Sequence, residues 1–282
     1  ETALKSAVYL ATRAIRFYVV TDDLLLYTRL GGAIAPWPPH HRLKLDLQYL
    51  PTWGDLPPHL RLLEDKFRPC SCQRLLLPHL LPHEEAVIYL DTDVIFLAPP
   101  DLLWAQLRAF GPHAVLGGAA PTMIQRGAQE AATAPGPAQP RLQPGDWQHQ
   151  DLLNHVFNQR PALLHPLPCP WNFRWPMCEA TQERCPALLQ GGAYAVHGIG
   201  GAFVSRAHPE MVKFHATWAS WQLTGARGAL AAALQGALVP PGPRVGACAH
   251  FRPLVYLLTN QLWADSPLYR HYYDDSDDSD GR

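Results

Sequence analysis

An almost unbroken apolar run, residues 86–97, constrains the fold of this chain more than any other feature of its sequence. Its only polar interruption is the triplet Asp91, Thr92 and Asp93. A continuous apolar run is typical of a central strand that is covered on both faces, as in a parallel α/β sheet. Ligands of such sheets bind outside the carboxyl ends of the strands. We therefore expect the two aspartates to lie at a ligand-binding edge, where this strand ends.

The two aspartates are suited to a divalent cation. Side chains two residues apart lie on one face of a strand, and just past its end they still converge. Hard cations prefer carboxylate oxygens, and Mn²⁺ also accepts an imidazole. His197 ends a later apolar run and is followed by Gly198, which frees the backbone. We expect Asp91, Asp93 and His197 to share one metal. The alternative is a loop carboxylate that caps the next helix, but unpaired charge in an apolar run is costly.

The remaining patterns predict one α/β domain over residues 1–265, a length that supports a single large core. Residues 33–59 are expected to be mostly loop, residues 117–146 an irregular insert, and residues 266–282 a disordered acidic tail. Helices are predicted over 1–14, 73–80, 101–110, 150–157, 211–223 and parts of 226–264, and strands over 16–21, 43–50 and 86–97.

Charge and cysteine content narrow the class of protein. A net charge of −1 with no basic stretch argues against nucleic-acid binding. No apolar run is long enough to cross a bilayer, so we expect any membrane anchor to lie upstream of this fragment. Cys178 and Cys185 bracket a short polar loop, and a disulfide between them would indicate an oxidising compartment. The alternative, that all six cysteines are free thiols, stays open.

Five segments together resemble glycosyltransferase family 8, and within it the glucoside xylosyltransferases. They are residues 67–78, 89–97, 150–154, 169–174 and 197–198. The resemblance runs from about residue 1 to about residue 220, apart from the insert. It implies a Rossmann-like GT-A domain with a mostly parallel central sheet, here incomplete at the N-terminus.

The resemblance also implies an activity and a cellular setting. The activity is retaining, α-linked transfer of xylose from UDP-xylose to glucose that is O-linked to EGF-like repeats of the Notch type, with manganese as cofactor. Family members are type II membrane proteins whose catalytic domain lies in the lumen of the secretory pathway, in the Golgi or endoplasmic reticulum.

Position by position, the resemblance assigns roles to particular residues. Asp91, Asp93 and His197 match the metal ligands, and Gln150 and Asp151 match the catalytic stretch that lines the donor sugar. The residues assigned to substrate binding are Arg74, Thr21, Asp22, Trp171, Asn172, Arg174 and Arg206. Because only Asp151 offers a carboxylate beside Gln150, we favour same-face attack over double displacement.

Several of these residues have an ordinary alternative role. Asp151 would complement a helix N-terminus, Trp171 would anchor the core, and Arg74 would pair with Glu64 or Asp65 on the surface.

The chain departs from the family pattern at four places. The family's opening strand would precede Glu1, and the Ala- and Pro-rich insert replaces a segment with an N-S-G-V-M-like core. His149 stands where the family has an acid, and Ala207 where it has a lysine, with Arg206 adjacent. These departures predict weak or absent turnover for this polypeptide. Two other functions stay open: an inactive relative that binds UDP or an EGF-like partner, and a structural secreted module.

Overall fold

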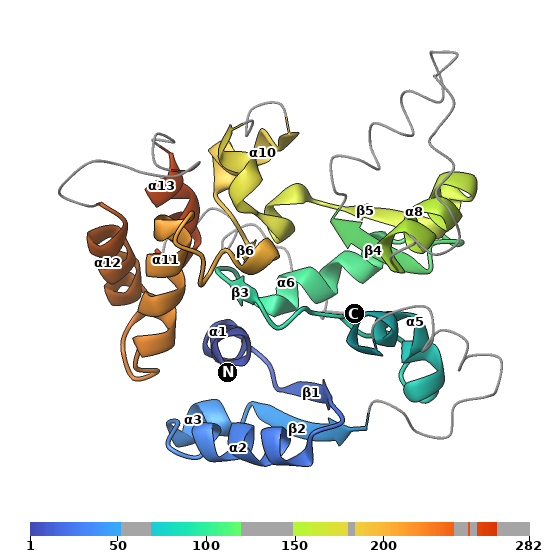
Figure 1. The fold of residues 1–282 in the computed structure, drawn as a ribbon, viewed down its shortest axis with the longest axis horizontal. Helices are drawn as coiled ribbons and strands as arrows, with labels where there is room; N and C mark the ends of the chain where they lie inside the picture. The colour runs from blue at the N-terminus through green and yellow to red at the C-terminus, as the bar shows by residue number, and fades with distance from the viewer. Residues whose placement is uncertain (52–68, 120–148, 180–183, 240–247, 249–252, 264–282) are drawn as a thin grey trace, which may run out of the picture.

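The computed structural model describes residues 1–51, 69–119, 149–179, 184–239, 248 and 253–263. The α/β class is confirmed in this part of the chain (Figure 1). The α-helices are α1 (Thr2–Leu10), α2 (Leu24–Ile34), α3 (Pro39–Arg42), α5 (Pro69–Leu80), α6 (Pro100–Ala105), α8 (His149–Gln159), α10 (Ala187–Gly191), α11 (Pro209–Ser220), α12 (Arg227–Leu238) and α13 (Leu254–Thr259). The 3₁₀ helices are η1 (Gln106–Ala109), η2 (Pro161–Leu163), η3 (Cys169–Asn172), η4 (Trp175–Glu179), η5 (Ile199–Gly201) and η6 (Asn260–Leu262).

The described strands form three separate two-stranded sheets. They are β1 (Ile15–Val20), β2 (Leu45–Leu50), β3 (Val94–Phe96), β4 (Leu116–Ala119), β5 (Leu164–Leu167) and β6 (Ala195–His197). Strands β1 and β2 are parallel, as are β4 and β5, whereas β3 and β6 are antiparallel. The predicted α/β class with mostly parallel pairing is confirmed, although the described strands are not joined into one central sheet. Antiparallel pairing of β3 needs a partner that arrives from the opposite direction, which no local pattern reveals.

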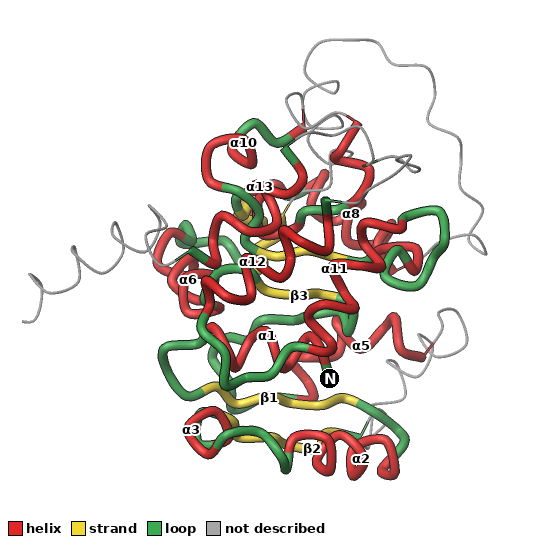
Figure 2. The backbone as a smooth tube through the Cα atoms, turned by 90° about the vertical axis from the view of Figure 1, so that its left-hand side faces the viewer, coloured by secondary structure: helices red, strands yellow, loops and turns green. Residues whose placement is uncertain are grey.

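Helix α1 is the centre of the packing. Residues 4–10 are all buried, as expected for a helix that is surrounded by protein on every side. The hydroxyl of Ser6 accepts a hydrogen bond from the backbone N–H of Phe96 at 2.9 Å, which joins α1 to β3. Figure 2 shows α1 between β3 and the β1–β2 pair. On another side, α11 contacts α1, and α12 contacts both α11 and α13.

The predicted strand over residues 86–97 is mostly not a strand. Only Val94–Phe96 pairs with another strand, and residues 91–93 form a turn in which the N–H of Val94 donates to the carbonyl of Asp91 at 3.3 Å. Residues 86–90 belong to no helix or strand and are only partly covered, with Val87 39% exposed. The physical reason is that no described strand lies alongside them, so no hydrogen-bonded pairing forms. The aspartates consequently precede the short strand and do not follow a long one.

The other predicted elements agree closely with the structure, except at the insert and over residues 33–59, where the predicted loop contains α3 and the end of α2. The helices and strands predicted near residues 16–21, 43–50, 73–80 and 150–157 are present. Residues 117–119 of the predicted irregular insert belong to β4, and the rest of the insert lies outside the described residues, as does the tail over 266–282. Of the described helices, none combines the length and the apolar character that crossing a membrane requires.

Two disulfides correct the predicted cysteine pairing. Cys169 is bonded to Cys185, and Cys178 is bonded to Cys248. The predicted Cys178–Cys185 bridge is wrong, and so is the free-thiol alternative for these four residues. Proximity in sequence misled the prediction, because Cys178 lies beside a residue 70 positions later in the chain. Disulfides remain characteristic of an oxidising compartment.

Candidate metal centre and its cleft

The pairing of β3 with β6 brings the imidazole to the acids. In this antiparallel register Val94 lies opposite His197, which places the histidine directly beside the turn that carries both aspartates. The N–H of Gly198 donates to the carbonyl of Asp93 at 2.8 Å and extends the pairing by one step. The turn and the end of β6 are thus joined by the strand pairing and by this additional backbone bond.

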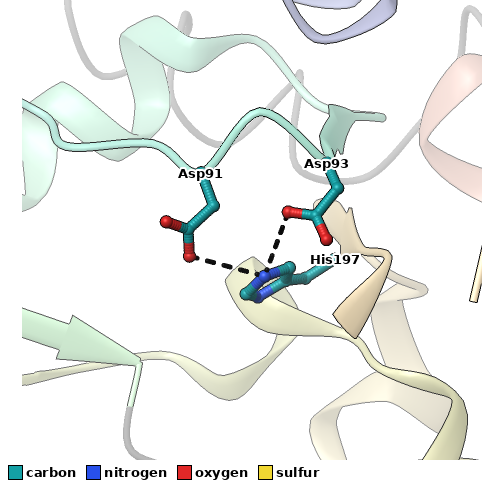
Figure 3. Close-up of side chains that lie close together, drawn as sticks. All are labelled: Asp91, Asp93 and His197. Atoms are coloured by element: carbon teal, nitrogen blue, oxygen red, sulfur yellow. Dashed lines mark ion pairs between the residues drawn. The ribbon is translucent and has the colours of Figure 1, made fainter. Parts of the chain in front are cut away.

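The three predicted metal ligands converge (Figure 3). The Nε2 atom of His197 lies 3.5 Å from an oxygen of Asp91 and 3.4 Å from an oxygen of Asp93. One ligand atom from each residue lies within 4.8 Å of the other two. Ligands held at about 2.1 Å from one ion lie roughly 3 Å apart, so small side-chain movements bring all three to a common ion. Two hard oxygens and one imidazole nitrogen fit a divalent cation of the Mn²⁺ type.

The electrostatics keep the Asp93 carboxylate charged. A hydrogen bond from His197 holds the pKa of Asp93 below its usual range, although partial burial acts in the opposite direction. All three side chains are partly buried. Partial burial weakens solvent screening, so the two acids would attract a cation more strongly than exposed carboxylates do.

Arg74 contacts the same centre from α5. Its Nη2 donates to the carboxylate of Asp91 at 3.2 Å, and its guanidinium lies 4.7 Å from the centre of the Tyr89 ring. Burial raises the pKa of Tyr89, and the nearby charge of Asp91 acts in the same direction. Among the described residues, none accepts a hydrogen bond from the buried Nε–H of Arg74. Glu64 and Asp65, the alternative partners of Arg74, lie outside the described residues.

A cleft of about 1810 Å³ adjoins this centre. Its lining includes the metal ligands, Arg74, Thr21 and Asp22, together with residues 15–20 of β1 and the segment 86–90. The N–H groups of Ile15 and Thr21 bond to the carbonyls of residues 44 and 50. Because bonding alternates along a strand, the backbone groups of residues 16, 18 and 20 face away from β2. The cleft therefore offers backbone donors and acceptors as well as charged side chains.

The structure separates the remaining predicted substrate residues from the cleft. Trp171 is 7% exposed and packs edge-on against Phe96 and Tyr194, which favours its core role. Arg174 is half-buried, and burial lowers its pKa. Arg206 is exposed, and neither arginine lines the cleft.

For two further predicted residues the side chains are not described, and a third makes a different contact from the predicted one. Gln150 and Asp151 lie in α8, but their side chains are outside the described part of the chain. Asn172, predicted to contact substrate, lies with its side-chain oxygen 3.1 Å from Nδ1 of His197. No local pattern indicates this contact, because the two residues are 25 positions apart.

Fold and site together define an α/β protein with a carboxylate–imidazole centre beside a large cleft. In sequence the chain resembles the glucoside xylosyltransferases, as its motifs predicted. Glucoside xylosyltransferase 1 of Danio rerio is 26% identical over 257 residues, which cover 73% of this chain and 60% of that protein. The human glucoside xylosyltransferase 1 is 25% identical over 244 residues, covering 72% and 54%. Glucoside xylosyltransferase 2 of Xenopus laevis is 27% identical over 259 residues, covering 76% and 60%.

The chain thus spans between about half and three fifths of the length of these relatives. No protein-family model matches it. Among solved structures, the apo form of mouse xyloside xylosyltransferase 1 superposes with a TM-score of 0.49 and 16% identity, over 71% of this chain and 92% of that one.

Proposed function

We propose that this chain is a retaining GT-A glycosyltransferase that moves xylose from UDP-xylose, in α-linkage, to glucose O-linked to EGF-like repeats. The observation that carries the proposal is the convergence of Asp91, Asp93 and His197 beside a cleft large enough for a sugar nucleotide. The similarity to proteins named glucoside xylosyltransferases supports the donor and the acceptor. The two disulfides support a luminal site in the secretory pathway, in the Golgi or endoplasmic reticulum.

In this proposal Asp91, Asp93 and His197 hold Mn²⁺. When bound, the cation supplies positive charge for the diphosphate that leaves as the glycosidic bond breaks. Arg74 adds a second positive charge beside Asp91, and its buried Nε–H, which has no acceptor in the described part of the chain, would donate to a phosphate oxygen. Thr21 and Asp22 line the same cleft at the end of β1 and would contact the donor.

The proposed reaction keeps the configuration of the transferred xylose by same-face attack. The leaving phosphate then takes the proton of the acceptor hydroxyl, and the protein contributes mainly position and charge. Gln150 would lie near the anomeric carbon and Asp151 would orient sugar hydroxyls. This assignment rests on the sequence pattern of α8 and on the resemblance to the family.

The direct test is release of UDP from UDP-xylose by protein secreted with its disulfides intact. Because of the departures from the family pattern, we expect the turnover to be weak, to require Mn²⁺ and to increase when a glucosylated EGF-like repeat is added. Asp93→Asn should remove the turnover, because it replaces a charged ligand with a neutral amide. Asp46→Asn is a matched control, because Asp46 is an exposed acid on β2 that pairs with Arg16 and does not line the cleft. Metal-independent turnover, or equal turnover in the Asp93→Asn protein, would refute the proposal.

A second candidate function is metal-dependent UDP binding without transfer. It is favoured by the position of Arg206, which was expected to replace the family's lysine beside the donor phosphate. Arg206 does not line the cleft, so it does not supply that positive charge. Calorimetric titration with UDP, with and without Mn²⁺, separates the two functions. Mn²⁺-dependent binding without any UDP release from UDP-xylose would identify the binder.

A further inference from the structure

The two nitrogens of the His197 ring have different partners. Nε2 faces the carboxylates of Asp91 and Asp93, at 3.5 and 3.4 Å. Nδ1 lies 3.1 Å from the side-chain oxygen of Asn172. The ring is therefore held on one side by an amide and directed on the other towards the proposed metal position.

The chemistry of these partners selects one tautomer. A neutral imidazole carries its proton on one nitrogen and a lone pair on the other. The amide oxygen of Asn172 can only accept a hydrogen bond, so it favours the proton on Nδ1 of His197. When a cation occupies the site, the lone pair is then on Nε2, the atom that faces the acids, whereas without the cation this nitrogen donates to Asp93. A metal ligand requires that lone pair, and hydrogen bonding at the other nitrogen fixes it.

Asn172 is itself held firmly against β6. Phe173, the next residue, is fully buried, and its backbone N–H donates to Ala195 at 3.0 Å while its carbonyl accepts from His197 at 2.8 Å. Further back, the N–H of Tyr194 donates to Pro170 at 2.8 Å. The helix η3 begins at Cys169, which the disulfide joins to Cys185. Asn172 and His197 thus keep a fixed relative position without help from a ligand.

We propose that Asn172 is a positioning residue that sets the tautomer and the direction of His197 for a divalent cation. This inference rests on the proposed metal centre and deepens it. It replaces the substrate-contact role predicted for Asn172 with an indirect one, exerted through the imidazole.

The first test measures Mn²⁺ affinity by calorimetry on metal-free protein, in the absence of nucleotide. Asn172→Leu keeps the approximate volume but removes the acceptor, and should weaken Mn²⁺ binding by about 10- to 100-fold. Asn172→Asp keeps an acceptor at the same place, and should retain at least the wild-type affinity. Melting of the metal-free proteins serves as a control, because a merely structural role would lower stability equally in both variants. Equal Mn²⁺ affinity of the wild-type and Asn172→Leu proteins would overturn the inference.

The second test determines the protonation of His197 with the site occupied. Nitrogen chemical shifts from NMR report which nitrogen of a histidine is protonated, and His197→Gln identifies the signals of His197. With the diamagnetic cation Zn²⁺ bound to the wild type, we expect the proton on Nδ1 and the cation at Nε2, and in Asn172→Leu we expect this preference to weaken. A Zn²⁺-bound wild type with the proton on Nε2 would contradict the inference. If no divalent cation binds, the metal centre and this inference fail together, whereas cation binding without release of UDP from UDP-xylose refutes only the proposed transfer.

Discussion

Replacing Gly198 with alanine should damage the metal centre through steric crowding. A Cβ atom added to Gly198 would lie 2.5 Å from the ring of Phe203, about 0.9 Å closer than the 3.4 Å at which ordinary contact begins. Phe203 cannot easily retreat, because it is 6% exposed and stacks on His215 with ring centres 5.0 Å apart. Gly198 has φ of −80°, so its backbone is open to other residues, and close approach explains the glycine.

Overpacking of this kind costs about 1–3 kcal/mol of stability. The strain falls next to the bond between the N–H of Gly198 and the carbonyl of Asp93, so Mn²⁺ affinity should fall together with stability. Urea unfolding gives the free energy of unfolding, and calorimetry gives the affinity. Gly236→Ala is the matched control: this glycine lies inside α12 with nothing within 4 Å of its added Cβ. That change should stabilise the protein by about 0.5–1 kcal/mol.

A second-site change tests the cause. Phe203→Leu removes ring atoms from the place that the new Cβ would occupy. Combined with Gly198→Ala, it should cost less than the sum of the two single changes, with a coupling energy of about 0.5–3 kcal/mol. Strictly additive effects, or an unchanged free energy of unfolding in Gly198→Ala, would refute the reasoning from steric contact.

Three further predictions concern the metal, the disulfides and pH. Mn²⁺ together with UDP should raise the melting temperature of the wild type but not of Asp93→Ala, since a ligand that binds only the native state stabilises it; an equal rise in both would place the metal elsewhere. Replacing Cys178 and Cys248 with serine should lower the free energy of unfolding by about 2–4 kcal/mol, measured in denaturant under oxidising conditions; an unchanged value would show that the bridge does not constrain the unfolded chain. Burial lowers the pKa of His41, so this ring binds a proton more weakly in the folded state than in the unfolded chain, whose pKa is about 6.5. Stability should therefore fall as pH is lowered from 7.5 to 5.5, and His41→Gln should flatten the fall; identical pH profiles would exclude His41 as the cause.

Local patterns in the sequence were enough for most elements and for the metal ligands. The apolar run that ends at Val20 is a strand, and the amphipathic stretches are helices. Asp91 and Asp93 were detectable because an unpaired charge inside an apolar run is energetically costly and therefore indicates a functional site. Each of these signals is contained in a short window, where the spacing of apolar and polar residues reflects the local backbone.

The features that escaped prediction depend on contacts between distant residues. The bridge from Cys178 to Cys248 spans 70 positions, and the contact between Asn172 and His197 spans 25. The antiparallel direction of β3 follows from where β6 arrives and not from the composition of either strand. The glycine at position 198 was explained by backbone freedom, whereas the structure shows that the nearby ring of Phe203 leaves no room for a Cβ atom. None of these contacts can be recognised from the spacing of apolar and polar residues within a short window.

The metal centre depends both on a local sequence pattern and on contacts between distant residues. The two aspartates come from one turn, but the third ligand depends on the register between β3 and β6. Side chains alternate between the faces of a strand, so a slip of one residue would turn His197 to the opposite face. Three contacts prevent that slip: Gly198 bonds to Asp93, His197 bonds through its backbone to Phe173, and the imidazole bonds to Asn172. A centre whose ligands are separated by a hundred positions is thereby assembled before any cation arrives, and binding need only draw the three side chains together.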